Sequence, residues 1–196
     1  MVRSAGATVN VSELLPNVQK QSARLQAQAE KALAAGDYHS AEQLFADAIH
    51  LTPSTASIAN NLGVIALRRR DVDTAVRWIQ KASEEAPYRA DILGNLGLVR
   101  WMQHRDEESY GILLEAFSRG YESNMGHYIL GRVGLEKGAS KDSLDHLKKV
   151  RPDRFPDRDL YLSIALRDCG KTEAADKAFR NFLRRHRAPF LISSYR

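Results

Sequence analysis

Small and large apolar residues recur along the chain at intervals of 34 residues. One recurring position is always small and another is always large and apolar. The small position is filled by Ala29, Gly63, Gly97 and Gly131, and the large one by Phe45, Ile79, Leu113 and Leu147. A second small position is filled by Ala41, Ala75, Ser109 and Ser143. The register holds over four copies, so the chain contains an internal repeat.

A fifth copy follows after 32 residues instead of 34, so that Leu147 corresponds to Phe179 and Ser143 to Ala175. The two missing residues fall around "RPDRFPDRD", which contains Pro152 and Pro156. Because proline ends one helix and delays the next, this stretch predicts a loop.

Within each copy the apolar spacing is that of a helix. In the second copy Leu62, Ile65 and Ala66 share one face, and Ala75 and Ile79 share another. Short polar stretches separate the two faces, among them "AGDYHS", "RRRDVD" and "CGKTE". Each copy is therefore predicted to be a helix, a tight turn and a second helix. We expect the small residue of the first helix to let the large residue of the second approach closely, and Pro53 and Pro87 to end two of the second helices.

These residues resemble the tetratricopeptide repeat, which has a period of 34 and small, apolar and proline positions in this order. The match is carried by "NLG" at 61–63 and 95–97, "GDYHSAEQLFADAIHLTP" at 36–53 and "LGRVGLEKG" at 130–138. The resemblance covers about residues 22–186 of the chain. The chain departs from the pattern at Gln28 and Ala32, and at Tyr121 and Phe155, which stand where proline is usual.

The resemblance implies an all-α fold, a right-handed α-α superhelix or solenoid of about five helix-turn-helix units, with a concave inner surface. The repeats are expected at about 22–55, 56–89, 90–123, 124–155 and 156–186. Residues 1–21 are expected to form an arm or an extra helical turn, because "VSELLP" carries a serine cap before an apolar pair. Residues 187–196 are expected to form a tail that leaves the last helix at Pro189.

No window of the chain is apolar for long enough to span a membrane, and its first residues lack the apolar region of a secretion signal. A cytoplasmic location is the default expectation. Cys169 is the single cysteine and cannot form an internal disulfide. The excess of arginine over lysine, 20 to 9, is typical of a GC-rich bacterial genome.

The net charge of +5 lies entirely in residues 178–196, which carry five arginines and no acidic residue. A basic end suggests an anionic partner. The alternative is a solvated last helix whose cations favour its own C-terminal dipole. The candidate patch for an anionic partner consists of Arg180, Arg184, Arg185 and Arg187.

No catalytic or metal-ligating pattern is apparent. None of the six histidines is paired with another at a spacing of four residues, none has a cysteine nearby, and all are expected mostly at exposed or turn positions. The segment "LGNLGL" lacks the Gly-Lys-Ser of a phosphate-binding loop. We therefore expect no enzyme, no cofactor and no bound metal.

The resemblance implies that the first helix of each repeat lines the concave groove. The groove residues expected to contact a partner are Asn60, Asn61, Val64, Leu67, Asn95, Leu98, Trp101, Tyr128, Arg132, Tyr161 and Arg167. Asn61 and Asn95 lie one repeat apart, where their amides are suited to bond the backbone of an extended peptide. Lysine and arginine are missing at the positions of Gln26, Glu30 and Asp91, so the carboxylate-binding function of some relatives is not transferred.

The aromatic and apolar side chains of this face form a predicted strip of Leu98, Trp101, Tyr128 and Tyr161, with Arg132 and Arg167 beside it. Trp101 packing between helices is the alternative reading. The function expected from these features is a non-enzymatic scaffold that binds a peptide or helix of a partner protein. The other possibilities are self-assembly through the terminal segments and, less favoured because the rest of the chain is neutral, nucleic-acid binding at the basic end.

Overall fold

The computed structural model describes residues 11–52 and 54–192 of the chain, and the side chains of 15–52 and 54–186. All regular secondary structure within these described residues is helical. The chain divides into two compact units, residues 1–87 and 88–196, at the junction between the second and third predicted copies.

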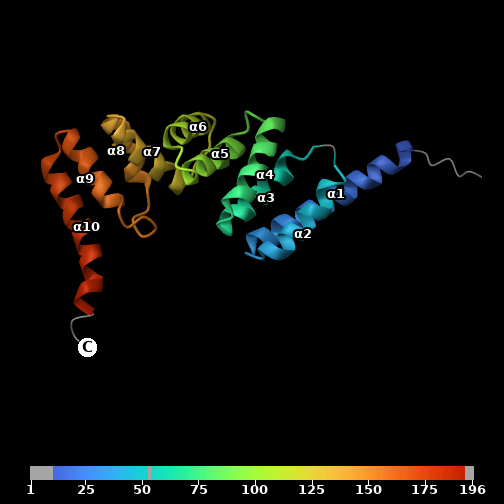
Figure 1. Ribbon diagram of the computed structural model, residues 1–196, viewed down its shortest axis with the longest axis horizontal. Helices are drawn as coiled ribbons and strands as arrows, with labels where there is room; N and C mark the ends of the chain where they lie inside the picture. The colour runs from blue at the N-terminus through green and yellow to red at the C-terminus, as the bar shows by residue number, and fades with distance from the viewer. Residues whose placement is uncertain (1–10, 53, 193–196) are drawn as a thin grey trace, which may run out of the picture. The chain divides into compact units, whose positions relative to one another are not determined.

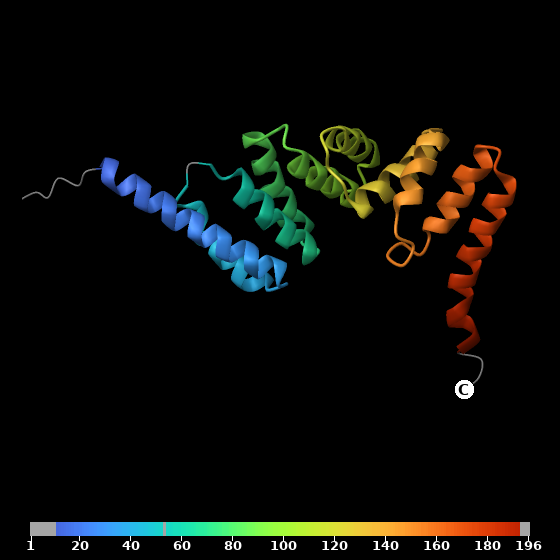
Figure 2. The same ribbon diagram turned by 180° about the vertical axis from the view of Figure 1, so that it is seen from behind.

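The first unit contains two helical hairpins, in which each helix lies beside the next one along the chain (Figure 1; Figure 2). Phe45, Ile58 and Ile65 are almost fully buried in its core, and Leu25 and Leu44 pack against them. Burying a side chain of this size contributes about 1.5–3 kcal/mol. Its helices are α1 (Val11–Ala34), α2 (Tyr38–Ile49), α3 (Ala56–Arg68) and α4 (Val72–Glu85).

The second unit contains three hairpins of the same kind. Its helices are α5 (Ala90–Met102), α6 (Asp106–Ser118), α7 (Asn124–Glu136), α8 (Ser140–Lys149), α9 (Arg158–Asp168) and α10 (Thr172–Ile192). The first helices of the three hairpins are neighbours, because α7 contacts both α5 and α9. Leu113, Ile129 and Val133 are buried in one apolar cluster of this unit, and Leu147 and Ala165 in the next.

The turn inside each hairpin has the same backbone conformation. Its central residue has a positive φ in all five hairpins, and these residues are Gly36 (79°), Arg70 (60°), His104 (59°), Gly138 (75°) and Gly170 (73°). The amide of the following residue donates to a carbonyl five residues earlier, as from Asp37 to Ala32 at 2.9 Å and from Lys171 to Leu166 at 2.9 Å. This left-handed cap satisfies carbonyls that the helix end leaves unpaired. The predicted polar turns are therefore confirmed.

The two helices of a hairpin approach each other too closely for a side chain at the recurring glycine. A Cβ atom added at Gly63 would lie 2.4 Å from Ile79 Cγ1, and one at Gly131 would lie 2.5 Å from Leu147 Cγ. At Gly97 the corresponding distance to Leu113 Cγ is 2.6 Å. The expected role of the small position is thus confirmed in these three hairpins, because no larger residue fits without moving its neighbour.

Aromatic side chains occupy the two inter-hairpin connections where proline is usual. The ring of Tyr121 lies over Gly94, where an added Cβ would be 2.3 Å from Tyr121 Cζ. Burial raises the pKa of Tyr121. Phe155 stacks on Tyr128 with ring centroids 4.6 Å apart and planes inclined by 18°. Each of these connections is therefore packed against the first helix of the hairpin that precedes it.

The C-terminal end of the chain departs from the prediction, and at the N-terminal end a helix reaches into the segment where an arm or an extra helical turn was expected. Helix α1 begins at Val11 and continues through Pro16, so the later part of the predicted N-terminal arm is helical. Helix α10 extends to Ile192, and the predicted helix end at Pro189 is wrong. Proline costs a helix one hydrogen bond, but its fixed φ is itself helical, so the backbone can continue past it. Residues 1–10 and 193–196, and the predicted break at Pro53, lie outside the described residues.

We predict that Gly97→Val destabilises the protein by about 1–3 kcal/mol, because its side chain overlaps Leu113 in a packed interface. The matched control is Gly111→Ala in α6, where nothing lies within 4 Å of an added Cβ. It is expected to stabilise by about 0.5–1 kcal/mol, because alanine favours the helix. Denaturant unfolding of both variants tests the close approach, and equal effects would contradict it.

We also predict that His104→Gly stabilises the protein by about 1 kcal/mol, because the left-handed conformation costs a residue with a Cβ about 1–2 kcal/mol. The reverse change, Gly138→Ala, places a Cβ at the corresponding turn and should destabilise by a similar amount. Thermal unfolding measures both effects. A His104→Gly variant less stable than the parent protein would show that the imidazole contributes more than the backbone strain costs.

Candidate functional site

Helices α5, α7 and α9 of the second unit bring the residues of the predicted strip together. Trp101 meets Tyr128 edge to face with ring centroids 6.5 Å apart, and Tyr128 meets Tyr161 in the same way at 6.0 Å. Leu98, Trp101 and Tyr161 are half-buried and pack against the apolar cluster that contains Tyr128. Because these residues come from neighbouring first helices, the strip crosses one face of the unit. From here on, the strip means Leu98, Trp101, Tyr128 and Tyr161.

Tyr128 is the buried centre of the strip and not part of its exposed surface. It is 5% exposed, and its hydroxyl donates a hydrogen bond of 2.7 Å to Asp157 Oδ2. Burial and the neighbouring Asp157 carboxylate raise the pKa of Tyr128. The expectation that Tyr128 contacts a partner is wrong, because Phe155 covers its ring. Tyr128 instead supports Trp101 and Tyr161.

Arg132 lies beside the strip on α7. Its guanidinium is 6.0 Å from the centre of the Tyr161 ring, and its Nε is 3.7 Å from Glu136 Oε1. The side chain is 31% exposed. A partly exposed guanidinium beside an aromatic ring is suited to bind carboxylate or carbonyl oxygens.

The asparagines predicted for the groove do not behave alike. Asn60 is 5% exposed, so the expectation that it contacts a partner is wrong. It occupies the same repeat position as Gly94 and Tyr128, which the structure also buries. Asn61 on α3 and Asn95 on α5 are both half-exposed. They belong to different units, and their joint use stays a prediction, as do the half-exposed Val64 and Leu67 of α3.

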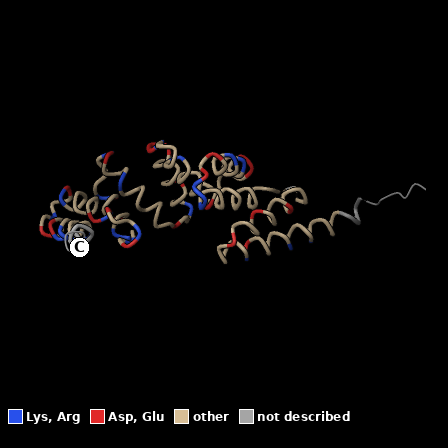
Figure 3. The backbone as a smooth tube through the Cα atoms, turned by 60° about the horizontal axis from the view of Figure 1, so that its bottom comes forward, with Lys and Arg blue, Asp and Glu red and all other residues tan. Residues whose placement is uncertain are grey.

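Two exposed arginines predicted to face a partner form ion pairs within the chain. Arg167 is exposed and donates to Asp176 of α10 at 2.8 Å. Arg185 Nη1 lies 2.6 Å from Oδ2 of Asp159, whose side chain is only 4% exposed. Arg185 is nevertheless exposed, so its place in the candidate anionic-partner patch stays a prediction. Arg180 and Arg184 are exposed, whereas the side chain of Arg187 lies outside the described residues. Acidic and basic residues are both scattered over the described part of the chain (Figure 3).

The buried Asp159 centres an ion network that was not predicted. Arg158 Nη1 binds its Oδ1 at 2.7 Å, while Arg185 of α10 binds its Oδ2. Burial lowers the pKa of Arg158, and the Asp159 carboxylate opposes this shift. A buried carboxylate held by two guanidinium groups ties the start of α9 to the second half of α10.

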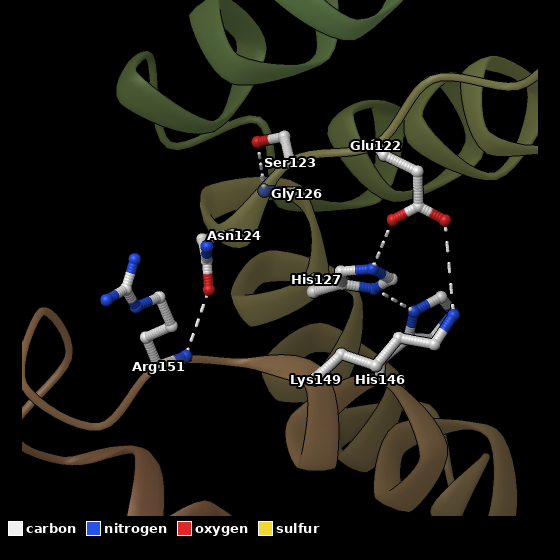
Figure 4. A network of polar contacts seen from close by, with 8 residues as sticks. All are labelled: Glu122, Ser123, Asn124, Gly126, His127, His146, Lys149 and Arg151. Atoms are coloured by element: carbon white, nitrogen blue, oxygen red, sulfur yellow. Dashed lines mark hydrogen bonds and ion pairs between the residues drawn. The ribbon is translucent and has the colours of Figure 1, made fainter.

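A histidine network at the junction of α6, α7 and α8 was also missed (Figure 4). Nδ1 of the buried His127 lies 2.8 Å from Nδ1 of His146, and its Nε2 lies 2.7 Å from Glu122 Oε2. Lys149 Nζ lies 4.0 Å from the other oxygen of Glu122. Burial lowers the pKa of both histidines. The expectation of histidines at exposed or turn positions is wrong for His127, which is 4% exposed.

The repeat register contains a signal for both networks. The position of His127 and Asp159 is filled in the three earlier copies by Leu25, Ala59 and Leu93. A polar residue at an otherwise apolar core position must find partners within the fold. Comparing copies for such exceptions, instead of searching for helical histidine pairs, would have identified both residues.

The described residues contain no group of three or more histidine, cysteine or acidic side chains arranged to hold a metal ion. In the same part of the chain, no helix is both long and apolar enough to cross a membrane. Cys169 is half-buried at the end of α9.

The fold defines the protein as an all-α solenoid of helical hairpins. Residues 27–90 match the family model of the tetratricopeptide repeat. Over this segment the chain therefore resembles the tetratricopeptide repeat, and the same hairpin geometry continues through α10. Tetratricopeptide-repeat proteins form a class of protein-interaction scaffolds. No curated protein matches the chain in sequence.

Several solved structures share the fold. The MamA protein is 17% identical, with a TM-score of 0.61 over 85% of this chain and 92% of that one. Pseudomonas aeruginosa PilF is 22% identical, with a TM-score of 0.64 over 86% of this chain and 78% of that one. YrrB, described as a tetratricopeptide-repeat protein with an unusual peptide-binding site, is 13% identical, with a TM-score of 0.65 over 94% and 96%. At these identities the likeness establishes the fold alone.

We predict that Arg185→Ala destabilises the second unit by about 1–3 kcal/mol, because it removes one of two cations from the buried Asp159. The matched control is Arg184→Ala, one residue earlier on α10 and exposed, with an expected change within about 0.5 kcal/mol. Denaturant unfolding compares them. Equal, small effects would show that Arg158 alone neutralises Asp159.

Proposed function

We propose that the protein is a non-enzymatic scaffold that binds a peptide or helix of a partner protein along the first helices of its hairpins. The observation that carries this proposal is the strip in the second unit, where Leu98, Trp101 and Tyr161 remain half-exposed around the buried Tyr128. The partner's side chains would contact Trp101 and Tyr161, and Arg132 would bind an oxygen of the same segment.

The energetics of this face favour a protein partner. Tryptophan, tyrosine and arginine are the residues that most often dominate binding energy at interfaces. Here they project from packed helices, so little side-chain entropy remains to be lost when a ligand binds. The hydrogen bond from Tyr128 to Asp157 and the stacked Phe155 hold the centre of the strip in place.

The half-exposed amides supply a second element of the proposal. Asn61 and Asn95 stand at the same position of successive copies, and an asparagine side chain offers both a donor and an acceptor to a peptide backbone. YrrB, which has a similar fold, is described as having a peptide-binding site, and this supports a peptide as the class of ligand. The strip would then determine which side chains of the peptide are preferred. The number of repeat copies that contact the peptide would determine how long a segment is bound.

Peptides selected from a displayed random library against the full chain serve as the probe for this function. We predict that Trp101→Ala weakens binding of the selected peptides at least tenfold, because truncating an interface tryptophan typically costs more than about 1.4 kcal/mol. Titration calorimetry measures the change. The matched control is Leu114→Ala, another large exposed apolar residue, which lies on the second helix α6.

Loss of binding in the Trp101 variant but not in the Leu114 variant would support the strip as the contact surface. Equal losses, or none in either, would overturn it. Asn61→Ala and Asn95→Ala separate the amide contribution, since each should weaken the same peptides if both amides bond the backbone. Circular dichroism of every variant ensures that a lost fold is not mistaken for a lost contact.

An anionic partner at α10 is the second candidate. Arg180 and Arg184 are exposed, and residues 178–186 contain no acidic side chain. Binding to such a patch would weaken steeply with added salt, whereas binding to the strip would not. Binding of a single-stranded oligonucleotide, measured at two salt concentrations, tests this candidate. Self-assembly through the terminal segments is a third possibility, tested by light scattering with and without residues 188–196.

A further inference from the structure

The junction of α6, α7 and α8 contains two histidine rings that share one hydrogen bond. The bond joins Nδ1 of His127 on α7 to Nδ1 of His146 on α8 at 2.8 Å, with ring centroids 5.1 Å apart. Phe117 of α6 packs edge-on against both rings, at centroid distances of 4.7 and 5.7 Å. The pair therefore connects the two helices of one hairpin and lies against the preceding one.

The chemistry of this contact limits how many protons the pair can hold. A nitrogen-to-nitrogen hydrogen bond needs one N–H and one lone pair. Glu122 accepts from His127 Nε2, so a neutral His127 has its lone pair at Nδ1, and His146 Nδ1 donates to it. A first added proton at His146 Nε2 leaves this arrangement intact. A second would put hydrogens on both facing atoms and place two cations side by side.

The internal repeat indicates that the pair is a specific departure from the pattern. His127 and His146 are 19 residues apart, and the corresponding pairs of the three earlier hairpins are apolar: Leu25 and Leu44, Ala59 and Trp78, and Leu93 and Ile112. Both members of the pair are thus histidine in the same hairpin. If only one apolar residue of the pair had been replaced by histidine, a buried imidazole would face an apolar side chain and leave a polar group unsatisfied.

We infer that His127 and His146 form a proton-sensitive latch, which holds the α7–α8 hairpin closed near neutral pH and releases it when both rings become protonated. The latch is a property of the hairpin and does not depend on the proposed function.

The charged groups around the two histidines favour or oppose protonation of each ring. Glu122, from the connection before α7, favours a proton on His127, whereas Lys149 of α8 opposes protonation of both rings. Asp142 of α8 acts weakly in favour of a proton on His146, and the α6 residue in contact, Phe117, does not titrate. Burial is the largest influence on both histidines, and their pKa values are lowered from 6.5.

The sign of the pH effect follows from this shift. When folded-state pKa values lie below those of the unfolded chain, the unfolded chain binds more protons as the pH falls through 6.5. For each proton that the unfolded chain binds and the folded chain does not, the unfolding equilibrium constant then rises by up to about tenfold per unit decrease in pH. The hairpin is consequently most stable above the ordinary histidine range and opens on acidification.

The test compares the full chain with the double variant His127→Leu/His146→Ile, which installs the pair that the preceding hairpin carries at Leu93 and Ile112. Hydrogen-exchange protection factors of α7 and α8 are measured at pH 7.5 and 5.0. We expect protection in the parent protein to fall at least tenfold between these values and protection in the double variant to be nearly constant. The exposed-histidine control His50→Gln should follow the parent protein.

Ring titration by nuclear magnetic resonance keeps the inference testable even where the double variant fails to fold. Both rings of the parent protein should titrate below 6.5, and protection of α7 and α8 should be lost over the same range. Rings that titrate at the ordinary value without loss of protection would overturn the latch. Equal pH dependence of protection in the parent protein and the double variant would overturn it as well.

Discussion

The close approach of two helices at a residue without a side chain is the contact on which each of the three central hairpins depends. At Gly63, Gly97 and Gly131 an added Cβ would lie within 2.4–2.6 Å of the partner helix. The large residues that face these glycines, Ile79, Leu113 and Leu147, are fully buried. Glycine is a poor helix former, so the loss in helix propensity is offset by the buried apolar area that the approach allows. The first-helix residues proposed to bind a partner are therefore held in position by this contact between the two helices of a hairpin.

The aromatic connections extend the same packing to the binding face. Where the repeat usually carries proline, Tyr121 fills the space left by Gly94, and Phe155 covers Tyr128. Because Tyr128 is fixed by Phe155 and Asp157, Trp101 and Tyr161 rest on a rigid support. At Phe155 the departure from the consensus thus supports the strip of the second unit. A proline at these positions could not have supplied a ring to stack on Tyr128.

The repeat and its helices were predictable from residue class alone, because apolar periodicity reports burial directly. The strip could be proposed only with the family resemblance, which assigns the first helices to the groove. The residues of the groove were less predictable. A first helix has faces directed to its own partner, to the next hairpin and to solvent, and neighbouring residues such as Asn60 and Asn61 differ in burial although they are alike in type. Long charged side chains were the least predictable, since Arg167 and Arg185 reach partners on other helices that spacing does not reveal. The prediction that Pro189 ends the last helix was also wrong, because the backbone of α10 continues past it.

The buried polar residues of the last two hairpins show that copies of one repeat need not be equally stable. A core position filled by Leu25, Ala59 and Leu93 in the earlier copies holds His127 and Asp159 in the later ones, each satisfied only through partners on neighbouring helices. Replacing apolar contacts by a polar network seldom increases stability, but it makes stability conditional on charge. Because burial lowers the pKa of both histidines, the histidine pair is weakened by mild acid. In a solenoid, stability is set by each repeat and its interfaces, so mild acid should loosen the α7–α8 hairpin locally.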